Sequence, residues 1–219
     1  MDALSHSLTV ARPAHYYTLG QPTAATRELW FVLHGYGQLA EFFIRHFRVL
    51  TDDAEPERTV IVAPEALNKF YLDGTHGRVG ATWMTKDKRE PEITAYVNYL
   101  NQLYALLRPL APAARVTLLG FSQGTATVSR WLTALPEAPA QLVLWAGAFP
   151  EDMVFTAAPS LLTGATQLHT VLGDDDPFVT PESKIRQVRF IESHGLRPIR
   201  HTFRGGHTLD AGVLRALQL

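Results

Sequence analysis

Short apolar runs alternate with longer stretches of helical periodicity along these 219 residues, which predicts an α/β fold with a mostly parallel, twisted sheet and helices on both faces. The runs are almost uninterrupted in apolar residues, as is typical of strands that helices cover on either side. The length fits one domain, so we expect residues 1–219 to form a single unit. The predicted strands are Leu29–Leu33, Thr59–Ala63, Val116–Leu119, Leu142–Trp145, Leu168–Leu172 and Ile199–Phe203.

Four segments between and after these strands have the patterns of helices. In the clearest, Ile93–Leu107, apolar residues recur every three or four positions, and Pro109 ends the pattern. In the segment Pro181–His194, Thr180 can cap the first turn and Gly195 suits the exit. The other two predicted helices are Ser122–Leu135 and Leu209–Leu217.

Residues 64–90 have neither a helical nor a strand period, and we expect an irregular segment there. A loop of that length inside a compact domain is usually functional. Its aromatic side chains include Phe70, Tyr71 and Trp83, which have no evident core face and are therefore expected to line a substrate pocket. The alternative is that they cover the edge of the sheet as a satellite cluster.

Charge and composition exclude several classes of function. Lys and Arg number 20 against 21 Asp and Glu, a balance that argues against nucleic acid as the main partner. The absence of cysteine excludes a cysteine nucleophile, a thiolate metal site and a disulfide framework. No apolar run is long enough for a transmembrane helix and no signal peptide is recognisable, so we expect a cytoplasmic protein.

The pattern Gly-x-Ser-x-Gly occurs at residues 120–124, between a predicted strand and a predicted helix. This is the context of a nucleophile elbow, a sharp turn that carries the nucleophilic serine of an α/β-hydrolase fold. The turn forces Ser122 into a strained backbone conformation, and the flanking glycines let the strand and the helix approach closely. The serine would also stand at a helix N-terminus, where the dipole favours negative charge. A Gly-Ser turn without chemistry is the alternative.

A serine nucleophile needs a base, and the base needs an acid that orients it. In this fold the order along the chain is serine, acid, histidine. His207 follows the last predicted strand, whereas His169 and His201 lie inside strands and His194 ends a helix. We therefore expect His207 to be the base, because catalytic loops lie at the carboxyl ends of parallel strands.

Three consecutive aspartates, Asp174, Asp175 and Asp176, follow the strand that ends at Leu172 and compete for the role of the acid. A calcium-binding loop is another interpretation of this cluster, but the spaced ligand pattern of such loops is missing.

A fourth segment with chemical potential is residues 34–38, His-Gly-Tyr-Gly-Gln, after the first predicted strand. Esterases of this fold place one oxyanion-hole amide in that loop and the other on the residue after the nucleophile. The two amides here would be those of Tyr36 and Gln123, each worth several kcal/mol at the transition state. A plain tight turn at His34 and Gly35 is the alternative.

Together these four segments resemble the phospholipase/carboxylesterase family, the small esterases related to acyl-protein thioesterases. Its members look like LHGxG, GFSQG, GxxDPxV and GH in that order, and the matches here are residues 33–37, 120–124, 173–179 and 206–207. The resemblance implies that Asp176, directly before the proline, is the acid that binds His207. It also implies that Tyr36 and Gln123 supply the oxyanion amides.

Three departures from the family pattern fall in regions that shape the substrate pocket. The family's W-F-D segment reads Trp-Met-Thr at residues 83–85, its L-S-G reads Trp-Ala-Gly at residues 145–147, and residues 64–66 replace a proline-rich strand end. The resemblance therefore bears on the reaction type more than on the substrate.

The expected activity is hydrolysis of a carboxylic ester through an acyl-enzyme, without a cofactor or a metal. Thioesters and lysophospholipids are also open as substrates, as are acyl-chain length and a homodimeric state. Two rivals stand beside hydrolysis. One is acyl transfer to an acceptor other than water, perhydrolysis included. The other is a binding protein of the same fold without turnover, which the intact serine, aspartate and histidine disfavour.

Overall fold

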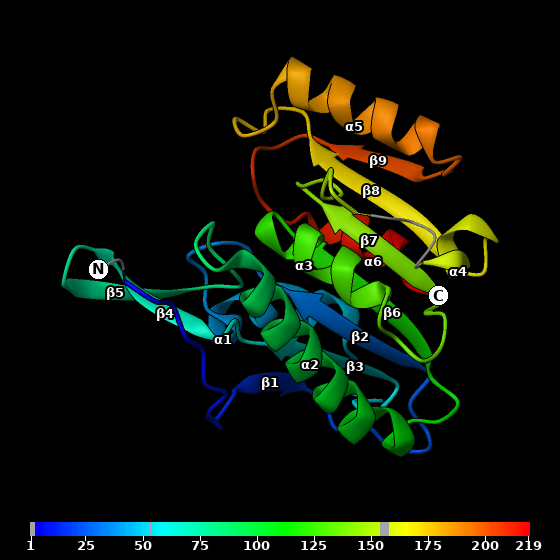
Figure 1. Cartoon of the computed structure of the whole chain (residues 1–219). Helices are drawn as coiled ribbons and strands as arrows, with labels where there is room; N and C mark the ends of the chain where they lie inside the picture. Colours follow the sequence, from blue (N-terminus) through cyan, green and yellow to red (C-terminus); the bar gives the residue numbers. More distant parts are fainter. Residues whose placement is uncertain (1–2, 53, 154–157) are drawn as a thin grey trace.

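The computed structural model describes residues 3–52, 54–153 and 158–219, and in this part of the chain seven strands form one sheet (Figure 1). Their order is β1-β3-β2-β6-β7-β8-β9, and neighbouring strands run parallel except β1 and β3. The mostly parallel sheet is therefore confirmed. The strands are β1 (Tyr16–Leu19), β2 (Glu28–Leu33), β3 (Thr59–Pro64), β6 (Arg115–Phe121), β7 (Gln141–Trp145), β8 (Gln167–Gly173) and β9 (Ile199–Phe203).

Helices cover both faces of this sheet, as the sequence predicts (Figure 1). One buried apolar cluster joins the sheet to α2, α3, α4 and α5, and a second joins the opposite face to α1, a 3-10 helix and α6. The central strands β2, β3 and β7 are buried along their whole length between these two layers. The helices are α1 (Ala40–Phe43), the 3-10 helix Ile44–Leu50, α2 (Arg89–Leu107), α3 (Gln123–Leu132), α4 (Pro159–Leu162), α5 (Pro181–Ser193) and α6 (Ala211–Ala216).

The local signals that delimit the predicted helices act as expected. Helix α2 ends at Leu107, and the chain continues as a short 3-10 turn that contains Pro109. The Thr180 hydroxyl accepts a hydrogen bond of 3.2 Å from the Ser183 N–H at the start of α5. Gly195, just beyond α5, has a φ of 66°. None of the described helices is long and apolar enough to cross a membrane.

The expectation of an irregular segment at residues 64–90 is wrong. Within it, β4 (Asn68–Asp73) and β5 (His76–Thr82) pair as an antiparallel hairpin that projects from the body of the molecule (Figure 1). The hairpin is largely exposed, so its residues do not show the alternation of apolar and polar side chains that marks a half-buried strand. The two loop residues are Gly74, with φ of 69°, and Thr75, and a glycine at the first loop position is a recognised hairpin signal that could have revealed it.

Other elements are too short to be recognised from periodicity. Strand β1 has four residues and pairs with β3 at the sheet edge, while α1 and α4 have four residues each. A pattern needs several repeats before it stands out from neighbouring residues, which these elements do not provide.

Candidate active site

The turn between β6 and α3 holds Ser122 in a strained conformation, with φ of 53° and ψ of −117°. Such a positive φ is uncommon for a residue with a side chain and persists only where the surroundings enforce it. The Ser122 N–H donates to the Trp145 carbonyl at 2.8 Å, and its own carbonyl accepts from the Thr125 N–H at 3.0 Å and hydroxyl at 2.7 Å. The hydrogen bonds on both sides of the turn keep the serine between strand and helix.

Two glycines allow this turn to form. A Cβ on Gly120 would lie 2.3 Å from the Gly124 carbonyl oxygen, and a Cβ on Gly124 would lie 2.3 Å from the Leu33 oxygen. Real Cβ atoms do not approach oxygen so closely, so any other residue would push α3 away from β6 and β2. The motif Gly-x-Ser-x-Gly is therefore a steric requirement of the strand–turn–helix junction.

His207 and Asp176 meet across the loops that follow β9 and β8. The His207 Nδ1 lies 2.8 Å from the Asp176 Oδ2, and the other oxygen, Oδ1, accepts the Phe178 N–H at 3.0 Å. The Asp176 side chain is 1% exposed, whereas Asp174 and Asp175 are exposed to solvent. Of the three consecutive aspartates, the structure thus brings only Asp176 to the histidine.

The His207 ring also packs between two aromatic rings. Its centroid lies 4.9 Å from that of Phe121, the residue before Ser122, and 4.7 Å from that of Phe178. These contacts place the histidine beside the turn that carries the serine. Among the described residues no hydrogen bond joins the Ser122 hydroxyl to the His207 ring, whose Nδ1 contacts Asp176 instead.

The contacts of His169, His201 and His194 lie within the sheet or at the end of α5 and not beside Ser122. His169 in β8 and His201 in β9 stack with ring centroids 5.3 Å apart and share a contact of 3.0 Å between Nδ1 and Nε2. Burial, and then the neighbouring His201, lowers the pKa of His169 to about 4. His194 follows the last turn of α5, where its Nδ1 lies 2.7 Å from the Phe190 carbonyl oxygen.

His34, the first residue after β2, connects the loop that follows to Ala66. It is fully buried, its Nδ1 contacts the Gly35 carbonyl at 2.8 Å, and its Nε2 accepts the Ala66 N–H at 3.1 Å. Burial lowers the pKa of His34 to about 4, so the ring is neutral at pH 7. A neutral ring can accept the Ala66 hydrogen bond, which a protonated one would lose.

The loop at residues 35–38 is fixed against β5 beside Ser122. The Gly37 N–H donates to the Ala81 carbonyl at 2.9 Å, the Ala81 N–H donates to the Gln38 carbonyl at 3.1 Å, and the Gln38 amide oxygen accepts the Gly35 N–H at 2.8 Å. Within the described chain the N–H groups of Tyr36 and Gln123 have no acceptor. Both are therefore available to an oxygen atom from a ligand.

The Gln123 side chain has a role that the sequence reasoning missed. Its Oε1 accepts the Trp83 N–H at 3.2 Å, and its Nε2 donates to the Met84 carbonyl at 3.0 Å. These bonds tie the N-terminus of α3 to the end of β5, and so connect the serine turn to the hairpin. The partners at residues 83 and 84 are main-chain atoms, so these hydrogen bonds do not depend on the side chains that depart from the family pattern.

The three residues expected to line a pocket differ in position. Trp83 is 1% exposed, its Nε1 donates to the His34 carbonyl at 2.9 Å, and its ring packs 5.2 Å from that of His34. Phe70 and Tyr71 lie on β4; the Phe70 ring packs 5.1 Å from that of Tyr36, while Tyr71 is half exposed. Trp83 thus belongs to the main apolar core rather than to a satellite cluster at the sheet edge, and its part in substrate selection stays a prediction.

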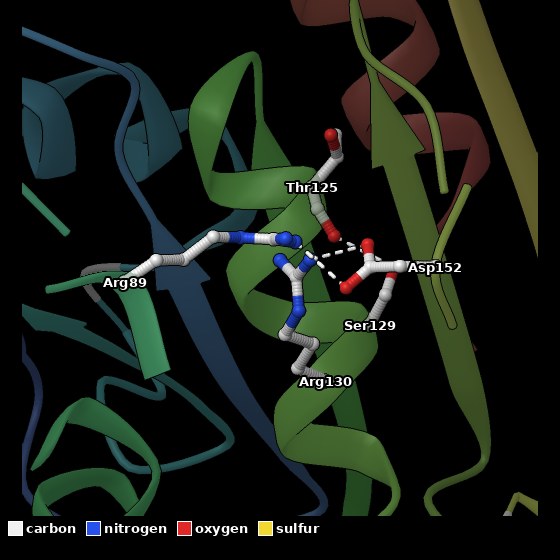
Figure 2. Close-up of polar contacts among 5 residues, drawn as sticks. All are labelled: Arg89, Thr125, Ser129, Arg130 and Asp152. Atoms are coloured by element: carbon white, nitrogen blue, oxygen red, sulfur yellow. Dashed lines mark hydrogen bonds and ion pairs between the residues drawn. The ribbon is translucent and has the colours of Figure 1, made fainter. Parts of the chain in front are cut away.

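A second feature absent from the sequence reasoning is an ion-pair cluster around Asp152, beyond β7. Figure 2 shows the guanidinium groups of Arg89 from α2 and Arg130 from α3 converging on its carboxylate, at 2.7 and 2.8 Å. Burial alone would raise the pKa of Asp152, but the Arg89 hydrogen bond and the Arg130 charge outweigh it and lower the pKa. The Thr125 hydroxyl adds a bond of 3.2 Å to the Ala148 carbonyl. Together these contacts fix the segment after β7 onto α2 and α3.

Comparisons with known proteins agree with the sequence motifs. A family model described as Phospholipase/Carboxylesterase matches residues 17–218. None of the curated proteins matches the chain by sequence. Similar solved structures include acyl-protein thioesterase 2 of Zea mays (16% identity, covering 94% of this chain and 98% of that one, TM-score 0.69) and a carboxylesterase from Mesorhizobium loti (21%, 93% and 93%, TM-score 0.68). Esterase PE8 is similar at 24% identity, with coverage of 93% and 95% and a TM-score of 0.64. The predicted α/β-hydrolase fold is confirmed.

The position of Trp83 generates a first prediction. Trp83→Ala should lower the free energy of unfolding by about 3–5 kcal/mol, because it leaves a cavity in the core and an unpaired carbonyl on His34. Urea denaturation measures this, with Tyr71→Ala on the exposed side of the hairpin as the control that stays near the wild type. If Trp83 is also a substrate wall, the ratio of kcat/KM between acetyl and octanoyl esters will shift. An unaltered ratio would remove Trp83 from the site.

The buried histidines generate a second prediction. The folded-state pKa of His34 lies below the unfolded value of about 6.5, so its stabilisation is complete above that pH and is lost as the pH falls toward 4. The loss should reach about 3 kcal/mol, with His169 adding to it in the same direction. Urea unfolding at pH 7.5, 6 and 5 measures the slope. His34→Asn and His169→Gln should each flatten it, and slopes equal to the wild type would contradict the assignment.

Proposed function

The chain belongs to the phospholipase/carboxylesterase family, and from this premise we propose that it hydrolyses carboxylic esters through an acyl-enzyme formed on Ser122. The observation that carries the proposal is the Asp176–His207 pair, 2.8 Å between Oδ2 and Nδ1 with the carboxylate buried, beside the strained turn that presents Ser122. A serine hydroxyl, an imidazole that takes its proton and a carboxylate that orients the imidazole form the set of groups that acyl transfer requires.

In the first step the Ser122 Oγ attacks the carbonyl carbon of the ester and forms a tetrahedral intermediate. The Nε2 of His207 takes the hydroxyl proton, and Asp176 holds Nδ1–H and stabilises the imidazolium that results. As the carbon–oxygen bond to the leaving group breaks, His207 returns the proton to the departing alkoxide. The products of this half-reaction are an alcohol and the acyl-Ser122 ester.

In the second step water attacks the acyl-Ser122 carbonyl while His207 accepts a proton from it. Collapse of the second tetrahedral intermediate breaks the bond to Oγ, returns the proton to Ser122 and releases the carboxylic acid. Asp176 can orient the ring in both steps because its second oxygen is occupied by the Phe178 N–H, which fixes the carboxylate plane. The same chemistry applies to thioesters, with a thiol as the leaving group.

The oxyanion of each intermediate needs hydrogen-bond donors that are already in place. The unpartnered N–H groups of Tyr36 and Gln123 suit this task. Gln123 directly follows the serine, and Gly35 brings the loop of Tyr36 against it, since a Cβ on Gly35 would lie 3.1 Å from that of Ser122. Donors fixed by the protein require no reorganisation when the charge develops, which is why they favour the transition state. The hydrogen bonds from the loop to β5 and from the Gln123 side chain to Met84 keep both donors rigid.

The nucleophile assignment has a direct test. A fluorophosphonate should label Ser122 alone, and Ser122→Ala should lose turnover of p-nitrophenyl acetate by about 10⁴-fold or more while it stays folded. Ser129→Ala is the matched control, because the Ser129 hydroxyl lies further along α3 and donates to the Thr125 carbonyl. Labelling of another serine, or an active Ser122→Ala enzyme, would contradict the proposal.

The three aspartates allow a second test on one loop. Asp176→Asn should lower kcat by about 10³–10⁴-fold, because an amide that donates to His207 favours the wrong tautomer. Asp174→Asn and Asp175→Asn change exposed side chains and should stay within about tenfold of the wild type. A collapse of activity confined to Asp174→Asn or Asp175→Asn would overturn the choice of Asp176.

A further inference from the structure

A cavity of about 350 Å³ lies between α5 and the strands β8 and β9 at the edge of the sheet (Figure 1). Among the described residues that line it are none of the groups assigned to the reaction above, which are Ser122, Asp176, His207, Tyr36 and Gln123. Phe178 lies between the two places, because it lines the cavity and its ring packs 4.7 Å from that of His207. The cavity is therefore a neighbour of the proposed catalytic centre and not a part of it.

The face of α5 that covers the strands changes from polar to apolar along the helix. Its residues in the cavity wall include Lys184, Gln187, Val188 and Ile191, which have the spacing of a single helix face. The second half of this stripe, Val188 and Ile191, is apolar, as expected of a helix packed on a sheet. The first half carries a cation and an amide, where packing alone would favour apolar side chains.

The cavity combines an apolar interior with two cations on its open side. Val171 of β8 and Ile191 of α5 line it and are buried, whereas Lys184 of α5 and Arg200 of β9 line it and are exposed to solvent. The two cations thus belong to opposite walls. In the part of the chain that the structure describes, neither of them forms a salt bridge, and no carboxylate lines the cavity. Their positive charge is therefore not balanced within the site.

Two further polar side chains line the cavity, and one of them lacks a partner. The Nε2 of Gln187 is buried and makes no hydrogen bond with any described residue. Buried amide groups without an acceptor are rare in proteins, because the N–H has been taken out of water without compensation. The other side chain, His201, already contacts the Nδ1 of His169 through its Nε2 at 3.0 Å. The donors open to a ligand are therefore Lys184, Arg200 and the Gln187 amide.

From these observations we infer that the cavity under α5 binds a free aliphatic carboxylate of medium chain length, at a site separate from the proposed catalytic centre. The carboxylate lies between Lys184 and Arg200, which bind it through charge-assisted hydrogen bonds, and the Gln187 amide is a further donor. The alkyl chain lies against Val171 and Ile191, where its burial from water adds to the affinity. The volume is at the small end of the range for ligand pockets, which suits a chain of medium length. The inference does not rest on the hydrolase function proposed above.

Isothermal titration calorimetry with octanoate tests the two halves of the site. Octanol and acetate should each bind at least about tenfold more weakly than octanoate, because octanol lacks the charge and acetate lacks the chain. Added salt should weaken the binding of octanoate, since it screens charges that are exposed to solvent. Equal affinities for octanol and octanoate would contradict the role of the cations.

Variants that remove one charge at a time test the residues. Lys184→Gln and Arg200→Gln should each lower the affinity for octanoate by about tenfold, because each removes a charged donor to the carboxylate. Arg189→Gln is the matched control, because it removes the same charge from an exposed position of α5 outside the cavity wall, and it should change the affinity less than about twofold. Val188→Trp fills the cavity and should abolish binding, with thermal melts to show that each variant is folded. Wild-type affinity in folded Lys184→Gln and Arg200→Gln would overturn the inference.

Amide chemical shifts in NMR spectra locate the bound octanoate. Addition of octanoate should shift the amide signals of residues 184–191 and 199–202, which form two walls of the cavity. Shifts confined to residues 35–38 and 120–125 would place octanoate at the proposed catalytic centre and overturn the inference. None of these measurements needs turnover. A protein that binds octanoate under α5 but hydrolyses no ester would contradict the hydrolase proposal alone, so the two failures are distinguishable.

Discussion

Between β6 and α3 the main chain passes so close to its neighbours that two positions have no room for a side chain. Gly120 meets the Gly124 carbonyl and Gly124 meets the end of β2, which brings a helix and two strands together around one residue. Ser122 takes the positive φ that this close approach requires. Its hydrogen bonds to Trp145 and Thr125 fix the turn to β7 and α3. The loop at residues 35–38, Gly147 after β7 and the end of the hairpin all lie against this turn, so their places follow from its geometry.

The carboxyl edge of the parallel sheet accounts for the meeting of residues that lie far apart in the sequence. Asp176 and His207 are 31 positions apart, yet β8 and β9 pair in register and end side by side. The Asp174 N–H bonds the Phe203 carbonyl at 3.0 Å and the Asp175 N–H bonds the Gly205 carbonyl at 3.0 Å. These main-chain bonds turn the first two aspartates outward and the third inward. The choice among three identical side chains is thus made by backbone pairing, which a local sequence pattern does not contain.

The long buried strands and amphipathic helices were predictable because each repeats its pattern over many residues. The serine turn was predictable because its steric demand imposes glycine at fixed spacing. The β4–β5 hairpin was not, since it buries little surface and so leaves no periodic trace. The burial of Trp83 could not be predicted from its own segment, which has no periodic pattern. Its indole donates to the His34 carbonyl and packs against the rings of His34 and Tyr96, which lie far away in the sequence. The ion pairs of Asp152 were unpredictable for the same reason, because their partners Arg89 and Arg130 lie on α2 and α3, far from Asp152 in the sequence.

The edge position of β9 has a consequence for how the molecule loses activity. Strand β6 is buried along nearly all of its length, whereas β9 ends the sheet with mostly exposed residues, and α5 above it contributes one residue to the buried core among those described. Local opening costs least where few apolar contacts are broken, so within the main sheet β9 and the helix α5 above it should exchange their amide hydrogens sooner than β6. The proposed nucleophile, Ser122, follows the well-buried strand β6, whereas the proposed base, His207, follows the exposed edge strand β9. If His207 is the base, mild heating would therefore separate it from Ser122 before the fold as a whole is lost.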